Sequence, residues 1–398
     1  MPPRTRWGVA AVGIAAIVAL VAALVVVVAG GDDGTGGGAG GSGSSTSLPP
    51  ADEDELRQAV DEISTAVEDE RGLEFERRVD VELADDDEFA QRLLDDFEED
   101  EDEIRRTEAL LEGFGLADPD GDLVASLRSL LEVAVVGFYD PETDELVVRG
   151  TALTPYVRTT IAHELTHALD DQHFDLDRPE YDDADDEIGF GFSAVAEGNA
   201  RRIETAYLDT FSAAEREAVA DEELAIGLGA DLSDVPFVLV ELLDAPYSHG
   251  LELVTQLLDA GGQAQLDEAL AEPPRTSEQV LDPDAFLAGE DRVAVPHPEV
   301  AGEVVDEVVA GQLLVELVLA DELDRESARQ AAEGWGGDWV VAWRDGDRSC
   351  VTLTVVGDTR DDTGELADAF DEWAAAQQDA TVTTTPDAGP VTVEACAG

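Results

Sequence analysis

The sequence predicts an α+β fold that is predominantly helical, with a small β-sheet beside one central helix. Long stretches carry apolar residues at spacings of three and four, which is the helical period. Residues 133–138 and 145–149 are β-like and flank Asp140-Pro141-Glu142-Thr143-Asp144, a strong turn signal, so they predict a hairpin. A helical segment with the run His-Glu-Leu-Thr-His follows at residues 163–167. That run predicts where the chemistry lies.

The charge balance limits the possible partners. The net charge is −70, from 93 acidic and 23 basic residues, and every basic residue is arginine. Such a chain repels nucleic acid and anionic lipid, so we expect no nucleic-acid partner. The acidic side chains repel one another, and salt screens this repulsion, so the composition fits a high-salt habitat. A base-composition bias in the source genome explains the same composition. The length of 398 residues leaves room for one large domain or two modest ones.

The N-terminal 50 residues predict that the chain is exported and held at a membrane. Residues 1–6 carry two arginines and indicate a cytoplasmic tail, and residues 7–29 are apolar over about the length that crosses ~30 Å of hydrocarbon. This length favours a single-pass anchor, but Val27-Val28-Ala29 also fits a signal cleavage site and a secreted product. Residues 30–50 predict a Gly/Ser-rich linker. In both cases we expect residues 51–398 to form an extracytoplasmic domain.

Residues 51–132 predict an N-terminal region of helices and one strand. The pattern indicates a helix from Asp52, an alternating strand over residues 75–83 and a second, very acidic helical stretch over residues 88–114. These helices are either surface helices of the fold or an inhibitory pro-region. We expect the catalytic core at residues 133–330 and a C-terminal hairpin and helix region at residues 331–398.

The hairpin lies directly before the central helix. A sheet edge can bind an extended peptide as an added strand, so a bound peptide could run past that helix. Alternatively, the hairpin only covers the core.

His163 and His167 lie four residues apart, so on a helix both imidazoles share one face and can bind one metal ion. Neutral imidazole is a good Zn²⁺ ligand, and a catalytic zinc ion keeps an open position for water whose pKa it lowers to near neutral. Glu164 stands beside them and fits the role of general base. The alternative is a chance occurrence of the pattern, but the apolar flanks predict a buried helix face at this position.

A catalytic zinc ion usually takes three protein ligands, and the chain offers three candidates for the third. His173 stands where metzincins supply a histidine, but Asp170 replaces their glycine and their Met-turn has no counterpart, since the single methionine is Met1. Glu197 lies in a predicted helix among small residues, which permits close packing against the histidine helix. It would complete a His₂Glu site of the thermolysin type, so we favour Glu197.

The third candidate is the acidic loop 182–187. Its oxygen count suits Ca²⁺, but the EF-hand spacing is absent, so a solvated loop is the better interpretation.

Tyr247 and His249 are candidate donors to the oxyanion that forms during peptide hydrolysis. The simpler interpretation of residues 244–250 is a turn at the start of a helix. Beyond it the pattern predicts a helix over residues 251–271 broken at Gly261-Gly262, a loop over 273–300 and an apolar helix over 304–323. A second hairpin around Asp345-Gly346, a helix to about residue 378 and a last strand near residues 391–394 complete the chain.

Two cysteines, Cys350 and Cys396, predict a disulfide bond. A lone pair in an exported protein is more often a disulfide than a metal site, and the spacing does not fit a zinc ribbon. The bond would join the last strand to the second hairpin.

Four segments together resemble a family of exported or membrane-anchored zinc metallopeptidases of prokaryotes: HELTHALDDQHFDL at 163–176, AEGNA at 196–200, PPRTSEQVL at 273–281 and GWGGD at 334–338. The similarity spans approximately residues 56–373. It implies a zincin-like fold of the gluzincin branch, with His163, His167 and Glu197 as zinc ligands and Glu164 as base. The chain departs from thermolysin at Arg201, where thermolysin carries an acidic residue four positions after the ligand glutamate.

We therefore expect a zinc metallopeptidase that hydrolyses a peptide or protein substrate outside the cell membrane. The alternative is a non-catalytic metal-binding surface protein that keeps the same fold.

Overall fold

The computed structural model describes residues 49–97, 101–182, 184, 186–229, 235–385 and 389–397. The predicted cytoplasmic tail (1–6) and membrane anchor (7–29) lie outside these residues, as does nearly all of the linker (30–50). Within the described ranges, no helix combines the length and the apolar character needed to cross a bilayer. The architecture is α+β and mainly helical, as the sequence predicts.

The N-terminal region begins with helix α2 (Glu53–Arg71), which Asp52 starts with a capping box. Helices α3 (Asp86–Phe97) and α4 (Glu101–Phe114) cover most of the acidic helical stretch predicted over residues 88–114. Residues 98–100 lie outside the described residues. Helix α5 (Leu123–Ala134) follows.

The first sheet has three strands in the order β1-β3-β2. The predicted hairpin is confirmed: β2 (Gly137–Asp140) pairs antiparallel with β3 (Glu145–Arg149). The strand predicted over residues 75–83 is mostly wrong, since β1 covers only Val81–Ala84 and pairs parallel with β3. Before it, the amides of Phe75 and Arg77 donate to the side chains of Glu68 and Gln172 instead of to a strand.

The central helices follow this sheet. They are α6 (Pro155–Phe174), the short α7 (Pro179–Asp182), α8 (Ile188–Asp209) and α9 (Ala213–Gly229). Helix α10 (Phe237–Gly261) continues through Pro246, so the predicted turn over residues 244–250 is wrong. An interior proline costs a helix about 3 kcal/mol, and the packing of the buried Ala245, Tyr247 and Gly250 stabilises this one against that cost. The predicted break at the glycine pair is confirmed, because α11 (Gln263–Ala271) starts after Gly262.

Two further predictions fail after α11. The loop predicted over residues 273–300 contains α12 (Ser277–Leu281) and α13 (Pro283–Ala288), and Thr276 and Asp282 cap these short helices. The helix predicted over residues 304–323 is instead strand β4 (Glu303–Val308) and helix α14 (Gly311–Leu319). Gly311 has φ of +71°, which interrupts a helix and which few residues other than glycine adopt.

The C-terminal sheet has five strands in the order β4-β5-β6-β8-β7. The predicted second hairpin is confirmed by β5 (Trp335–Asp345) and β6 (Arg348–Gly357), and the predicted helix and last strand by α16 (Arg360–Ala376) and β8 (Val391–Cys396). Helix α15 (Arg325–Ala332) and strand β7 (Ala380–Thr384) were not predicted. Cys350 and Cys396 are cross-strand partners in β6 and β8, and their disulfide bond is present as predicted.

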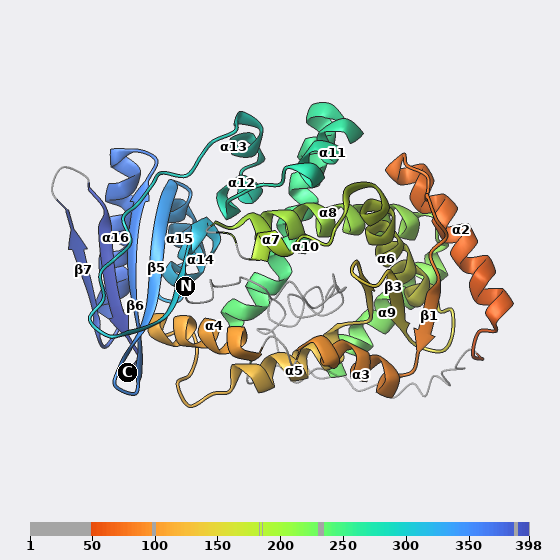
Figure 1. The fold of residues 1–398 in the computed structure, drawn as a ribbon, viewed down its shortest axis with the longest axis horizontal. Coiled ribbons are helices and arrows are strands. Elements are labelled where there is room, and N and C mark those ends of the chain that lie inside the picture. The colour runs from red at the N-terminus through yellow and green to blue at the C-terminus, as the bar shows by residue number, and fades with distance from the viewer. Residues whose placement is uncertain are drawn as a thin grey trace, which may run out of the picture.

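Figure 1 shows the two sheets at opposite ends of the molecule, with α8 and α10 between them. The largest core cluster joins α3, α4 and α5 to the five-stranded sheet and its helices. A second core packs α2 and the small sheet on α6, and a third packs α8 against α10 and α11. Helices α6 and α8 therefore lie where two cores meet, and they carry the candidate site.

Candidate metal centre

Helix α6 is buried along most of its length. Thr154 caps it, Pro155 occupies its first turn, and fourteen of its residues are buried, including every residue from Thr159 to Asp170. His163 and His167 lie one turn apart on this helix, with their ring centroids 4.9 Å from each other. Because the helix is buried on all sides, both imidazoles are held in the protein interior.

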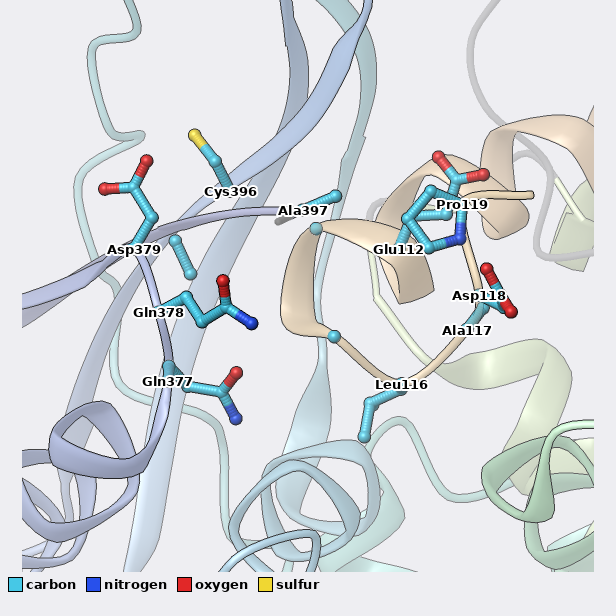
Figure 2. Close-up of a pocket in the computed structure, with 13 residues that line it drawn as sticks. Glu112, Leu116, Ala117, Asp118, Pro119, Gln377, Gln378, Asp379, Cys396 and Ala397 are labelled. Carbon is cyan, nitrogen blue, oxygen red and sulfur yellow. The ribbon is translucent and has the colours of Figure 1, made fainter. Parts of the chain in front are cut away.

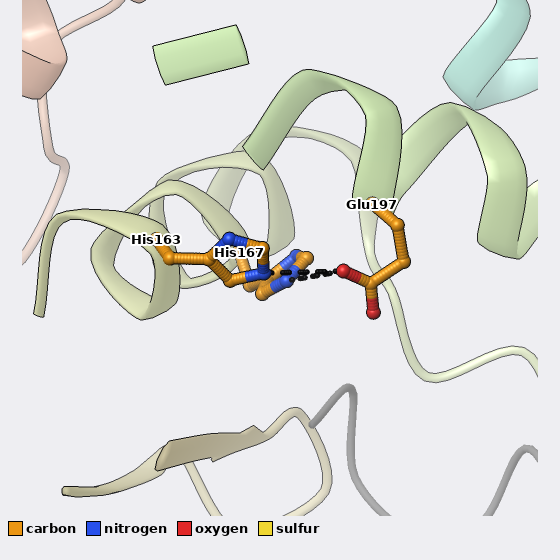
Figure 3. Close-up of side chains that lie close together, drawn as sticks. All are labelled: His163, His167 and Glu197. Carbon is orange, nitrogen blue, oxygen red and sulfur yellow. Dashed lines mark hydrogen bonds and ion pairs between the residues drawn. The ribbon is translucent and has the colours of Figure 1, made fainter. Parts of the chain in front are cut away.

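Glu197 of α8 meets both histidines. Its Oε2 lies 3.1 Å from Nε2 of His163 and 3.4 Å from Nε2 of His167, as Figure 3 shows. The potential ligand atoms of the three residues all lie within 4.8 Å of one another. The three residues are only 0%, 1% and 4% exposed. Two imidazole nitrogens and one carboxylate oxygen are the donor set of His₂Glu zinc sites.

His173, the other candidate third ligand, lies elsewhere. It is exposed near the end of α6, and its Nε2 is 2.9 Å from the backbone oxygen of Glu74. The structure therefore groups Glu197, and not His173, with the histidine pair.

Small residues bring α8 close to its neighbours, although the contact differs from the prediction. A Cβ atom at Gly198 would lie 2.1 Å from the backbone oxygen of Gly250, and one at Gly250 would lie 2.1 Å from the backbone oxygen of Ala194. The glycine beside Glu197 thus packs α8 backbone to backbone on α10, where we expected it to face the histidine helix. This contact fixes the position of Glu197 along its axis.

A buried polar network ties the two ligand helices together. The guanidinium of Arg71 donates to Asp170 over 2.6 Å, and the side-chain amide of Asn199 donates to the other oxygen of Asp170 over 2.6 Å. Asp170 stands three residues after His167, and Asn199 stands two residues after Glu197. The network therefore sets the spacing of α6 and α8 and joins both to α2.

The polar atoms at the centre fit a bound metal ion and a water molecule. Both carboxylate oxygens of Glu164 are buried without a side-chain hydrogen bond among the described residues, and Nε2 of His167 has its 3.4 Å contact with Glu197. A buried polar group without a partner is costly, and a ligand is one explanation for its presence. Strand β2 lies against the same carboxylate, since a Cβ at Gly137 would lie 3.1 Å from its Oε1.

The charges at the centre respond to burial and to one another. Burial lowers the pKa of His163, but hydrogen bonds to Glu197 and Glu204 outweigh it and raise the value to about 10. Burial lowers the pKa of His167 and raises the pKa of Glu164 well above its usual range. The nearby imidazoles overcome burial at Glu197 and lower its pKa, so this carboxylate is anionic, the form that binds metal.

Sequence reasoning missed Glu204. Its Oε2 lies 3.2 Å from Nδ1 of His163, on the far side of the ring from Glu197. Arg201 donates to the same oxygen over 3.1 Å. Glu204 follows Glu197 by seven residues, which is two helical turns and therefore the same face of α8. That spacing is the signal that could have found it.

The two candidate oxyanion donors differ in position. The ring of Tyr247 stacks on the ring of His163, with centroids 6.3 Å apart and planes inclined by 28°. His249 follows by two residues, about 200° around the helix. Burial lowers the pKa of His249, and its acidic neighbours Asp244, Glu252 and Glu241 raise it only in part. Tyr247 is thus brought to the metal centre, whereas His249 faces a different set of groups.

The acidic loop 182–187 has other partners where it is described. Asp186 forms an ion pair with Arg275 at 2.5 Å, and the Glu187 carboxylate accepts two hydrogen bonds from Ser277. Asp183 and Asp185 lie outside the described residues.

A separate cleft of about 460 Å³ lies between the end of α4 and strand β8. Figure 2 shows its lining, with Gln377, Gln378 and Asp379 on one side and Glu112 and Asp118 on the other. It contains none of the predicted site residues.

Comparison with known proteins gives one match. A family model described as a domain of unknown function (DUF8575) matches residues 259–396. No curated protein and no solved structure matches the chain. The matched stretch holds the five-stranded sheet and its helices, and it does not include α6 or α8.

Proposed function

We propose that this protein is a zinc metallopeptidase that hydrolyses peptide bonds with water, with a zincin-like fold of the gluzincin branch. One observation carries the proposal. His163, His167 and Glu197 converge from two helices, and the buried carboxylate of Glu164 lies in the same centre. Metal ligands with an adjacent carboxylate are what metal-assisted hydrolysis needs.

The donor set favours zinc over calcium. Two imidazole nitrogens with one carboxylate oxygen suit Zn²⁺, whereas Ca²⁺ takes six to eight oxygen ligands. We therefore assign Zn²⁺ to His163, His167 and Glu197, and we do not retain a Ca²⁺ ion at the loop 182–187.

Each residue of the site has a separate role in the proposed hydrolysis. Zn²⁺ held by His163, His167 and Glu197 would lower the pKa of a bound water and would polarise the scissile carbonyl. Glu164 is placed to take a proton from the water and return it to the leaving amine. Tyr247, beside His163, is the favoured donor to the developing oxyanion. The edge strand β2 lies against Glu164 and offers backbone groups for an extended peptide.

The disulfide bond between Cys350 and Cys396 supports an oxidising compartment. Together with the apolar run at residues 7–29, it supports a catalytic domain outside the cell membrane, anchored by that run or secreted after its cleavage.

The burial of the centre favours a second candidate function. Glu164 and both histidines are at most 1% exposed, so a peptide reaches them only after an element moves. A non-catalytic metal-binding surface protein needs no such access.

Two measurements on the purified domain test the proposal. Metal analysis should find one zinc ion per chain, and a chelator should remove hydrolysis of a denatured protein substrate. Glu164→Gln should keep the zinc and lower hydrolysis by at least about 10²-fold, because only the proton acceptor is lost. Zinc without any hydrolysis in the wild-type protein would select the binding function, and a chain without zinc would refute both functions.

A further inference from the structure

Glu197 and Glu204 hold the two ring nitrogens of His163 from opposite sides. Glu197 faces Nε2 at 3.1 Å, and Glu204 faces Nδ1 at 3.2 Å. Both carboxylates come from α8, two turns apart, and both are more than nine-tenths buried. The imidazole of His163 thus lies between Glu197, which is a proposed metal ligand, and Glu204, which is not.

We propose that Glu204 is a positioning residue that fixes the tautomer and orientation of His163, and that Arg201 acts through Glu204 by holding its carboxylate. This inference rests on the proposed metal site. A metal at Nε2 requires a neutral imidazole, whose proton must then lie on Nδ1. The Oε2 atom of Glu204 accepts that proton's hydrogen bond, and such a bond both fixes the ring and strengthens it as a ligand.

Arg201 makes this arrangement stable. A buried carboxylate needs a partner, and the guanidinium of Arg201 donates over 3.1 Å to the same Oε2 that faces His163. Two donors on one oxygen leave little freedom for the carboxylate to turn away from the ring.

Arg202 provides a matched control on the same helix. It is the next residue, it is partly buried, and it also forms an ion pair, with Glu70 at 2.6 Å. However, it donates to Asn199, the partner of Asp170, and not to Glu204. Loss of Arg202 therefore removes a comparable charge without touching the His163 partner, and the metal-free melting curves report any loosening of the Asn199–Asp170 contact.

The test is a chelator competition for Zn²⁺, repeated with Co²⁺, whose visible absorption reports the ligand geometry. The proteins are the wild type, Glu204→Gln, Arg201→Met, Arg202→Met and the double variant of Glu204 and Arg201. Glu204→Gln keeps the shape of the side chain, and we expect it to weaken metal affinity by about 10–100-fold and to shift the Co²⁺ spectrum. Arg201→Met should weaken affinity less, and it should add nothing in the Glu204→Gln background. Arg202→Met should stay within about twofold of the wild type.

The outcomes separate the two proposals. A wild type that takes up no metal overturns the proposed function and this inference together. A wild type that binds one ion, with a Glu204→Gln variant that binds it as tightly and shows the same Co²⁺ spectrum, overturns the inference alone. If Arg201→Met lowers metal affinity equally in the wild type and in the Glu204→Gln variant, Arg201 does not act through Glu204. Melting curves of all variants without metal show whether a loss of affinity is only a loss of fold.

Discussion

Arg71 and Asp170 form a buried ion pair with 2.6 Å between Nε and Oδ1, and this pair joins α2 to the helix that carries both histidines. Arg71 also contacts Asp267 and Gln263, so a single guanidinium links α2, α6 and α11. Burial lowers the pKa of Arg71, but the two aspartates outweigh it and raise the value, which keeps the group charged. Helix α2 is therefore tied directly to the helix that carries both histidines.

Arg71→Met should destabilise the protein strongly. It leaves the Asp170 carboxylate buried with only Asn199 as a hydrogen-bond partner, and breaking a buried ion pair in this way costs about 3–5 kcal/mol. The free energy of unfolding from urea titration measures the effect. Arg57→Met is the control on the same helix, because its pair with Asp54 is exposed and worth at most about 1 kcal/mol. Equal losses in the two variants would contradict the role of the network.

Gly250→Ala should displace Glu197 from the histidines. The added methyl group would lie 2.1 Å from the backbone oxygen of Ala194, so α8 and α10 must separate. We expect a loss of about 1–3 kcal/mol in stability and a weaker metal affinity. Gly364→Ala is the control, because Gly364 lies in α16 with no atom near its Cβ position and should gain about 0.5–1 kcal/mol. Unchanged metal affinity in Gly250→Ala would show that the close contact between α8 and α10 does not position Glu197.

Tyr247→Phe should lower kcat by about 10²–10³-fold if the proposed peptidase activity is correct. The variant keeps the ring that stacks on His163 and removes only the hydroxyl group, so metal content and KM should stay the same. Steady-state kinetics on a peptide that the wild type cleaves provides the measurement. His249→Ala should change kcat little, since this residue lies on another face of α10. A larger loss at His249 than at Tyr247 would reverse the assignment of the oxyanion donor.

The sequence predicts those parts of this site that depend on local spacing. Histidines four residues apart and small residues around Glu197 are enough to indicate a metal centre, and Asp140 to Asp144 indicate the hairpin. Glu204 was missed because one glutamate among many has no distinguishing pattern until the helix that carries it is placed against His163. The strand at residues 303–308 was predicted as helix because its short valine-rich pattern fits both periods, and only its pairing with β5 decides between them.

Glu187→Gln should flatten the pH dependence of stability. Burial raises the pKa of Glu187 to about 8, against the hydrogen bonds from Ser277 that favour the ionised form. The ordinary value is 4.5, so between these values the folded state holds a proton that the unfolded state has lost. The stabilisation of the folded state by this proton is complete below about pH 4.5 and is lost as the pH rises through 8. Between these values the free energy of unfolding falls by at most ~1.4 kcal/mol per pH unit. Urea titrations between pH 5 and 9 should show a smaller fall for Glu187→Gln than for the wild type. Glu180→Gln, at an exposed position on α7, should match the wild type, and a Glu187→Gln curve parallel to the wild type would contradict the assignment.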